Sequence, residues 1–128
     1  ICYEIVFSGQ VVDRSARPDY IFNPSNDGWF GSWGPPQHLA QARLRALEEG
    51  LPVLRSTTTG ISAVIDADGL VRQWLPTHVP GRMDGLIPPP KDPTFFARMG
   101  NVIPLVLALL LLVASVVARR FSKDYRSL

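Results

Sequence analysis

The residue type best suited to covalent chemistry in this sequence occurs once, at Cys2. A thiolate is a good nucleophile even though an unperturbed thiol has a pKa of about 8.5, and a basic neighbour or a helix N-terminus lowers that pKa further. Ile1, which precedes it, is typical of the last residue of a buried strand. The apolar residues that follow fall mainly at helical spacings, at Ile5, Val6, Val11 and Val12.

We therefore expect a strand, then a turn that carries Cys2, then a helix whose first backbone N–H groups point at the sulfur. On these residues alone, an unreactive structural thiol remains the alternative, because free cysteines are among the most buried residues.

Other residue types that support catalysis or metal binding are few. His38 is able to carry a proton or ligate a metal, but a histidine near the start of a helix more often pairs with loop backbone. Asp66 and Asp68 resemble the start of a calcium loop, yet the remaining ligands and the distal glutamate are absent, so we expect turn residues. A single cysteine excludes an intramolecular disulfide and a multi-cysteine zinc site. The sequence contains no Gly-x-Ser-x-Gly elbow, His-Glu-x-x-His motif, phosphate-binding glycine loop or dinucleotide fingerprint, so no metal or cofactor is expected.

The elements that must position these residues follow an α/β pattern with an antiparallel ending. Short strands are expected at 20–23, 51–55, 61–65, 70–74 and 85–87. A helix is expected over 37–49. Pro35 and Pro36 suit its first turn, and Gly50 fits the position just after it. The segment 66–69 predicts a hairpin turn.

The faces of the predicted helix differ in polarity. Its apolar stripe consists of Leu39, Ala42, Ala46 and Leu47. The charged residues that we expect to be solvated or paired are Arg43, Arg45, Glu48 and Glu49.

Large aromatic residues separated by glycines follow a cluster of turn formers at 23–28. Trp29, Phe30 and Trp33 show no regular period, which suits a loop that presents rings at a cleft or a membrane edge. Rings packed into the core of the domain are an equally weighted alternative, because indoles favour both settings.

The last quarter of the chain contains an apolar run, 102–118, without a charged residue. Its length lies at the short end of the about 17–25 residues that cross a bilayer. The basic residues that follow are Arg119, Arg120, Lys123 and Arg126. By the positive-inside rule we expect the C-terminus in the cytoplasm and residues 1–95 outside it. The expected divisions are a domain at 1–87, a proline-rich linker and interfacial segment at 88–100, a transmembrane helix at 101–118 and a basic tail at 119–128.

Charge and length exclude some classes of function. The formal net charge is +2, and five of the thirteen basic residues lie at Arg98 or beyond it. The basicity therefore indicates a membrane flank, and no nucleic-acid partner is expected. The absence of an initiator methionine and the strand-like Ile1 predict that the chain is part of a longer protein.

Four stretches in this order resemble the C-terminal part of the bacterial apolipoprotein N-acyltransferase family. They are Ile1-Cys2-Tyr3-Glu4, Asn23-x-Ser25-Asn26-Asp27-x-Trp29-Phe30-Gly31, Gln37-His38-x-x-x-Ala42-Arg43-x-Arg45-Ala46-x-Glu48 and Arg55-x-Thr57-x-x-Gly60-x-Ser62. The resemblance implies part of a nitrilase-like α/β/β/α sandwich, followed by one C-terminal transmembrane helix, in a multi-pass protein of the bacterial inner membrane.

The resemblance also implies roles for individual residues. Cys2 corresponds to the nucleophile of a Glu–Lys–Cys triad, and Tyr3 and Glu4 correspond to positions around the active site. Trp29 and Phe30 correspond to a loop near the cleft, where rings contact acyl chains. The Glu and Lys of the triad are expected upstream of this chain, which by itself is then not a competent enzyme.

The activity that the resemblance implies is lipoprotein maturation without a cofactor. A thiolate takes a fatty acyl chain from a membrane phospholipid as a thioester, and passes it to the N-terminal amine of S-diacylglyceryl-cysteine on an apolipoprotein. A membrane-tethered amidase of the nitrilase superfamily is the main alternative, and would use Cys2 on a small amide. A non-catalytic anchored binding module is the second, and would tolerate Cys2→Ser.

Overall fold

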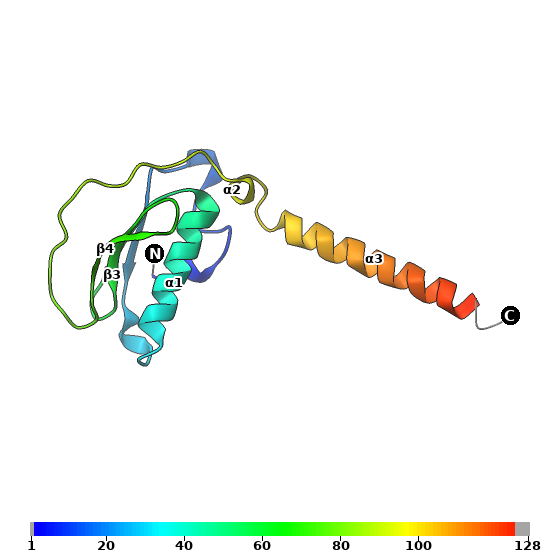
Figure 1. Cartoon of the computed structure of the whole chain (residues 1–128), viewed down its shortest axis with the longest axis horizontal. Coiled ribbons are helices and arrows are strands. Elements are labelled where there is room, and N and C mark those ends of the chain that lie inside the picture. Colours follow the sequence, from blue (N-terminus) through cyan, green and yellow to red (C-terminus); the bar gives the residue numbers. More distant parts are fainter. Residues whose placement is uncertain (1, 125–128) are drawn as a thin grey trace. The chain divides into compact units, whose positions relative to one another are not determined.

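The structure is a computed structural model that describes residues 2–124. The chain divides into two compact units, Ile1–Arg98 and Met99–Leu128, and each is described by itself (Figure 1). The first unit is a mixed α/β domain and the second is helical. This confirms the predicted fold class of an α/β domain followed by one apolar C-terminal helix.

The domain is built on a four-stranded sheet in the order β1-β2-β3-β4. Its strands are β1 (Ile21–Ser25), β2 (Val53–Thr57), β3 (Ser62–Ile65) and β4 (Val71–Leu75). The first two strands are parallel, with Ile21 opposite Val53, and the other pairings are antiparallel. The predicted hairpin is confirmed, because Gly69 in the β3–β4 turn has the left-handed φ of 70° that such turns require.

The long helix α1 (Gly34–Glu49) packs against β2 and closes the core. Pro35 and Pro36 lie in its first turn as predicted, and their missing N–H groups cost nothing there. Ala42 and Ala46 face the sheet and are fully buried, which lets the helix approach the strands closely. The core consists of Ile5, Ile21, Ala42, Ala46, Leu51, Val53, Ala63 and Ile65.

The apolar stripe of α1 differs from the prediction at Leu47, whose side chain is about half exposed. Arg45 is paired with Glu48, as one of the two expected settings for the charged residues requires. It is also buried, and donates to the Val6 carbonyl at 3.0 Å. A buried guanidinium is tolerated here because carbonyl and carboxylate oxygens meet it.

The helix predicted after Cys2 is wrong, because only one 3-10 turn, η1 (Tyr3–Val6), forms there. Phe7 is extended and Gly9 has a φ of 71°, so the chain leaves the helical path after four residues. The apolar residues that suggested a helix pack on the core individually: Ile5, Val6, Val11 and Val12. Their spacing therefore indicates which residues are buried, and it does not indicate a helix. The strand predicted to end at Ile1 lies outside the described residues.

The strand predicted at 85–87 is also wrong. Residues 85–87 have no strand partner, and the Leu86 side chain is 97% exposed. Proline residues on both sides have no backbone N–H to donate, so three apolar residues alone do not form the hydrogen bonds that join a strand to a neighbouring strand. Two further one-turn 3-10 helices, η2 (Arg14–Ala16) and η3 (Asp27–Trp29), lie in the loops before and after β1.

The C-terminal end of α1 is bound to the segment that follows the sheet. Arg17 donates from Nη2 to the Glu49 carbonyl at 2.8 Å and the Lys91 carbonyl at 3.0 Å. The Lys91 N–H donates to the Gly50 carbonyl at 2.9 Å, and the Thr94 hydroxyl donates to the Glu48 carbonyl. We call these contacts the Arg17 clamp. They satisfy carbonyl groups that a helix end leaves without intrahelical partners.

The helical unit contains a segment long and apolar enough to cross a membrane. The short helix α2 (Phe95–Met99) precedes α3 (Val102–Asp124). Residues Val102–Arg119 of α3 have a mean hydropathy of 2.6, and none of this segment is buried within the structure. An unburied run of leucine and valine is typical of a lipid-facing helix. The exact divisions between domain, linker, span and tail stay predictions.

Replacing Gly50 with alanine is expected to lower the free energy of unfolding by about 1–2 kcal/mol, because Gly50 has a φ of 65° that an L-residue adopts only under strain. The added Cβ would also lie 3.0 Å from the Asp92 carbonyl oxygen. Urea unfolding measures the change. Gly31→Ala is the control, because no atom lies within 4 Å of its added Cβ. Equal stability of the two variants would contradict the prediction.

Candidate active site

Strand β1 directs polar residues into the domain. Its burial alternates, with Ile21, Asn23 and Ser25 facing inward while Phe22 and Pro24 face outward. Asn23 is fully buried, and Ser25 nearly so. Because buried polar groups need hydrogen-bond partners, this half of the strand requires a polar network beneath it.

Asp27 is the centre of that network and is 1% exposed. Its Oδ2 accepts from Arg55 Nη2 at 2.6 Å, and its Oδ1 accepts from His38 Nδ1 at 2.8 Å. The Ser25 hydroxyl also donates to Oδ1, at 3.0 Å. Burial opposes ionisation, but the hydrogen bonds from His38 and Arg55 outweigh it and hold the pKa of Asp27 below its ordinary value.

The backbone around Arg55 and Gly60 fits closely over this carboxylate. Arg55 is buried, donating from Nε to the Ile61 carbonyl at 3.1 Å and from Nη1 to the Asn23 side chain. A Cβ on Gly60 would lie 1.9 Å from Asp27 Oδ2. Position 60 therefore has no room for a side chain, because the carboxylate occupies that space.

Cys2 lies directly above the network, at the N-terminal end of η1. Its Sγ is 3.4 Å from the Ser25 hydroxyl and accepts from the Asn26 backbone N–H at 3.4 Å. Its carbonyl accepts from the Asn23 side chain at 3.4 Å. The thiol is half-buried, so one side faces β1 and the other is accessible. A backbone N–H aimed at the sulfur stabilises a thiolate.

Tyr3 and Glu4 follow Cys2 but lie on the surface. The Tyr3 ring packs edge-on against Phe7, with 5.7 Å between ring centroids. Glu4 is exposed, and a hydrogen bond from its own backbone N–H holds its pKa below the ordinary value. Among the described residues, neither side chain is hydrogen-bonded to the Cys2 sulfur.

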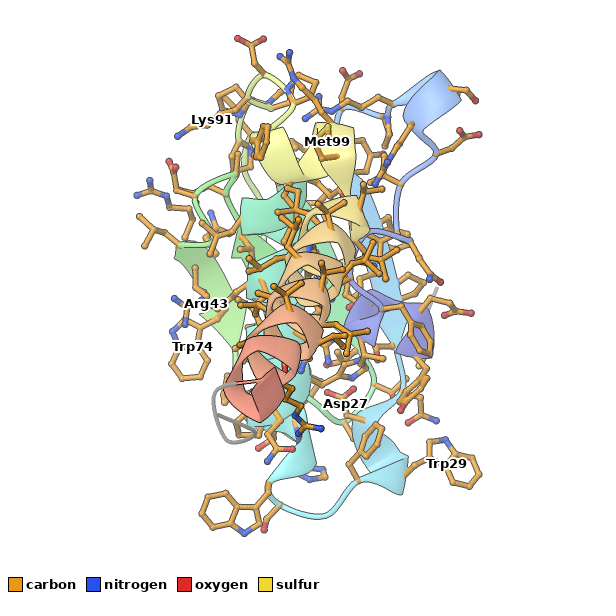
Figure 2. The ribbon with its side chains drawn as sticks, turned by 90° about the vertical axis from the view of Figure 1, so that its right-hand side faces the viewer. Asp27, Trp29, Arg43, Trp74, Lys91 and Met99 are labelled. Atoms are coloured by element: carbon orange, nitrogen blue, oxygen red, sulfur yellow. The ribbon has the colours of Figure 1, made fainter. Side chains whose placement is uncertain are left out.

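The two tryptophans of the aromatic loop point into solvent. Trp29 is 86% exposed and Trp33 is 80% exposed, so the alternative of rings packed in the core is wrong for both. Figure 2 shows the Trp29 ring projecting away from the ribbon. Phe30 is different, because it lies edge-on to the His38 ring with 5.7 Å between centroids.

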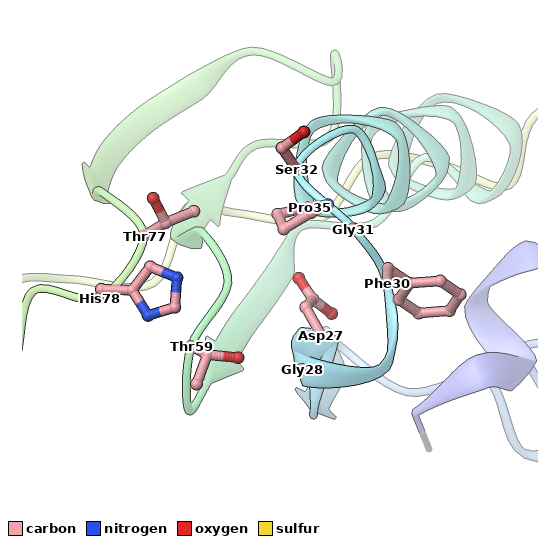
Figure 3. Close-up of a pocket in the computed structure, with 9 residues that line it drawn as sticks. All are labelled: Asp27, Gly28, Phe30, Gly31, Ser32, Pro35, Thr59, Thr77 and His78. Atoms are coloured by element: carbon pink, nitrogen blue, oxygen red, sulfur yellow. The ribbon is translucent and has the colours of Figure 1, made fainter.

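Phe30 also separates two cavities. The larger has a volume of about 590 Å³, and Figure 3 shows Phe30 at one side of it and Thr77 and His78 at the other. The smaller, of about 180 Å³, is lined by Tyr3, Phe30 and His38 among others. Cys2 lines neither cavity, whereas Phe30 and Tyr3 line the smaller one together.

The role expected for His38 is corrected by the structure, because its partner is the Asp27 carboxylate and not loop backbone. Its other ring nitrogen, Nε2, is buried without a hydrogen-bond partner among the described residues. Within residues 2–124, no cluster of three or more histidine, cysteine, aspartate or glutamate side chains is able to hold a metal ion.

Sequence reasoning assigned no role to Ser25, Asp27 or Arg55, although all three belong to the quoted motifs. The signal that identifies them is the alternation of side chains along β1, because Asn23 and Ser25 point to the same buried side of the strand as Ile21. Polar residues at inward positions of a strand predict buried partners elsewhere in the chain.

Residues 1–76 match the family described as carbon-nitrogen hydrolase. The chain belongs to the carbon-nitrogen hydrolase family. This confirms the nitrilase-superfamily membership predicted from the sequence.

Within this carbon-nitrogen hydrolase family, curated relatives named apolipoprotein N-acyltransferase are similar over nearly the whole chain. The protein from Bradyrhizobium diazoefficiens is 51% identical over 124 residues, which cover 94% of this chain and 23% of the relative. The Rhodopseudomonas palustris protein is 44% identical over 121 residues, with the same two coverages. The Haemophilus influenzae protein is 44% identical over 115 residues, or 88% of this chain and 22% of the relative. The chain thus spans under a quarter of the length of these relatives, and the resemblance stated above is confirmed.

Proposed function

We propose that this chain is the part of an apolipoprotein N-acyltransferase that carries the nucleophile, Cys2. The similarity to acyltransferases over 94% of the chain is the observation that carries the proposal. The geometry supports it, because Cys2 is only partly buried and its sulfur accepts a backbone N–H from Asn26. An accessible sulfur that faces a fixed donor is suited to nucleophilic catalysis.

The proposed reaction has two steps. The Cys2 thiol gives up its proton and attacks the ester carbonyl of a phospholipid. The ester C–O bond breaks, a thioester forms on Cys2, and the lysophospholipid oxygen takes up a proton as it leaves. The α-amine of S-diacylglyceryl-cysteine on an apolipoprotein then attacks the thioester and loses a proton, the C–S bond breaks, and the thiolate leaves as the amide forms. A thioester suits this sequence because it is activated toward amines and divides one difficult transfer into two easier ones.

The residues beside Cys2 have supporting roles in this proposal. In this proposal the Tyr3 backbone N–H stabilises the tetrahedral oxyanion, and Glu4 belongs to the surroundings of the active site. Trp29 and Phe30 contact the acyl chain, Phe30 from its position between the two cavities. The triad's Glu and Lys belong to sequence outside this chain.

Both substrates are lipid-anchored, so the reaction requires a catalytic domain held at a membrane. Helix α3 is long and apolar enough to supply one anchor. We propose that it crosses the bacterial inner membrane, with the basic C-terminus in the cytoplasm and the domain on the periplasmic side.

The test is direct detection of the acyl intermediate. The full-length parent protein in membranes is incubated with phospholipid that carries a labelled acyl chain, and the Cys2 peptide is analysed by mass spectrometry. A hydroxylamine-sensitive acyl adduct on Cys2 is expected. A folded protein whose Cys2 remains unmodified would overturn the proposal, and labelling of Cys2 by small amides alone would favour the amidase.

A further inference from the structure

The Ser25 hydroxyl lies between the candidate nucleophile and the buried carboxylate. Its oxygen is 3.4 Å from Cys2 Sγ and 3.0 Å from Asp27 Oδ1. Ser25 is 7% exposed, so water has little access to the hydroxyl. One hydroxyl with a single proton therefore has two acceptors in reach when Cys2 is ionised.

The protonation states of Asp27 and Cys2 determine how this hydroxyl is oriented while Cys2 is a thiol. Asp27 is ionised and accepts only, so the Ser25 proton points to its Oδ1. The lone pairs of Ser25 are then available to the S–H of Cys2. The thiol is thus held by a weak donor bond to Ser25 and by the Asn26 N–H.

Ionisation of Cys2 adds a second charged acceptor for the Ser25 proton, besides Asp27. A thiolate gains from a second donor, and Cys2 and Asp27 are then both charged acceptors, to which hydrogen bonds are about twice as strong as to neutral ones. Asp27 is able to release the Ser25 proton, because His38 at 2.8 Å and Arg55 at 2.6 Å continue to donate to it. Rotation of one hydroxyl is sufficient, and no backbone has to move.

We propose that Ser25 is a positioning residue for Cys2, whose hydroxyl donates to Asp27 while Cys2 is a thiol and turns to donate to the sulfur when Cys2 is a thiolate. The thiol proton passes to a base in solution, or to a carboxylate from the rest of the protein, and Ser25 keeps its own proton. This inference rests on the proposed function in one respect only, that the Cys2 thiolate is the reactive species.

The titratable neighbours of Cys2 along the chain are Tyr3 and Glu4 on η1. The charged and titratable groups next to Ser25 are Asp27 on η3 and His38 on α1, and Arg55 on β2 pairs with Asp27. Removing the Ser25 hydroxyl leaves all of them in place. A change in the pH dependence of Cys2 after that substitution is therefore assigned to the hydroxyl.

The experiment measures alkylation of Cys2 by iodoacetamide in the full-length protein across a pH series, with mass spectrometry of the Cys2 peptide. In Ser25→Ala, alkylation at neutral pH is expected to be about tenfold slower, and the midpoint of the profile to rise by about one pH unit. The direction follows because S–H is a weak donor, so loss of the bond to the thiolate outweighs loss of the bond from the thiol.

Ser8→Ala is the matched control. Its hydroxyl donates to the Glu48 carboxylate at 2.9 Å, so the substitution removes the same kind of bond and leaves the contacts of Ser25 with Cys2 and Asp27 in place. Its profile is expected to match that of the wild type. If Ser25→Ala does not fold, Ser25→Thr and Ser25→Val replace it, because the two are isosteric and Thr alone keeps the hydroxyl. The Thr profile is expected to lie about one pH unit below the Val profile.

A Ser25→Ala profile that overlays the wild type, or equal Thr and Val profiles, would overturn the role of Ser25. Because alkylation needs no lipid, this outcome is independent of the acyl-adduct test. In acyl transfer, Ser25→Ala is expected to lower kcat about tenfold while KM for phospholipid is unchanged. A merely structural role would not move the alkylation midpoint of a folded variant.

Discussion

Cys2→Ala in the full-length protein is expected to abolish transfer of a labelled acyl chain from phospholipid to a diacylglyceryl-cysteine peptide. Removal of a covalent nucleophile costs at least about 10⁴-fold in kcat, because the residues that assist it have nothing left to activate. Cys2→Ser is expected to be as inactive, since a serine hydroxyl at this position is not ionised by a single backbone N–H. Release of lysophospholipid and formation of labelled peptide, measured separately, check the two steps.

Loss of activity is informative only if the variant folds. Cys2 is half-buried and outside the core cluster, so we expect Cys2→Ala to change the free energy of unfolding by about 0.5 kcal/mol or less. The melting temperature of the purified variant gives the comparison. Substantial transfer by folded Cys2→Ser would mean that Cys2 is structural, as the binding-module alternative requires.

Asp27→Ala is expected to have the largest effect on stability, lowering the free energy of unfolding by about 3–5 kcal/mol. The substitution leaves the Arg55 guanidinium buried without its carboxylate, and removes the acceptor of His38 Nδ1. It also opens the space beneath Gly60 that the carboxylate fills. Urea unfolding measures the loss.

Asp84→Ala is the matched control, because Asp84 pairs with Arg82 on the exposed surface. Such pairs contribute about 0–1 kcal/mol, so little change is expected. Comparable losses in the two variants would show that burial of the Asp27 pair has no energetic consequence.

Acid provides an independent check on the same carboxylate. The pKa of Asp27 is lower in the folded protein than its ordinary value of about 3.9, because His38 and Arg55 donate to the ionised form. Its contribution to stability is therefore present above about pH 4 and is lost as the pH falls through the lowered pKa. The unfolding free energy of the wild type should fall more steeply below about pH 4 than that of Asp27→Ala.

Proline and glycine residues predicted the helix ends and the turn correctly, because these features depend on the backbone of a few neighbouring residues. Pro35, Pro36 and Gly50 bracket α1, and Gly69 marks the β3–β4 turn, because each acts through its own backbone angles. The helix expected to reach Val12 failed because apolar spacing reports which residues are buried and not the path between them. The strand at 85–87 failed because a strand needs a partner, which its own residues do not specify.

In the candidate site, too, features that depend on neighbouring residues were predicted, and features that depend on the tertiary fold were not. A lone cysteine next to a predicted turn was visible in the sequence, and its role as a nucleophile stays a prediction. Asp27 was hidden among turn formers, because its partners His38 and Arg55 lie 11 and 28 residues away. Only the tertiary fold brings three separate motifs to one carboxylate, so sequence spacing does not reveal their common purpose.

The Arg17 clamp has a mechanical consequence. Any tension from a membrane anchor enters the domain through residues 91–98, and the clamp holds this segment at the last turn of α1. His38 lies near the opposite end of that helix, which is 16 residues long and about 24 Å at about 1.5 Å per residue, and its contact with Asp27 joins it to the network beneath Cys2. If α3 anchors the domain in a membrane, as proposed above, force on the anchor reaches the domain at hydrogen bonds from Arg17, Lys91 and Thr94, which lie at the other end of α1 from His38.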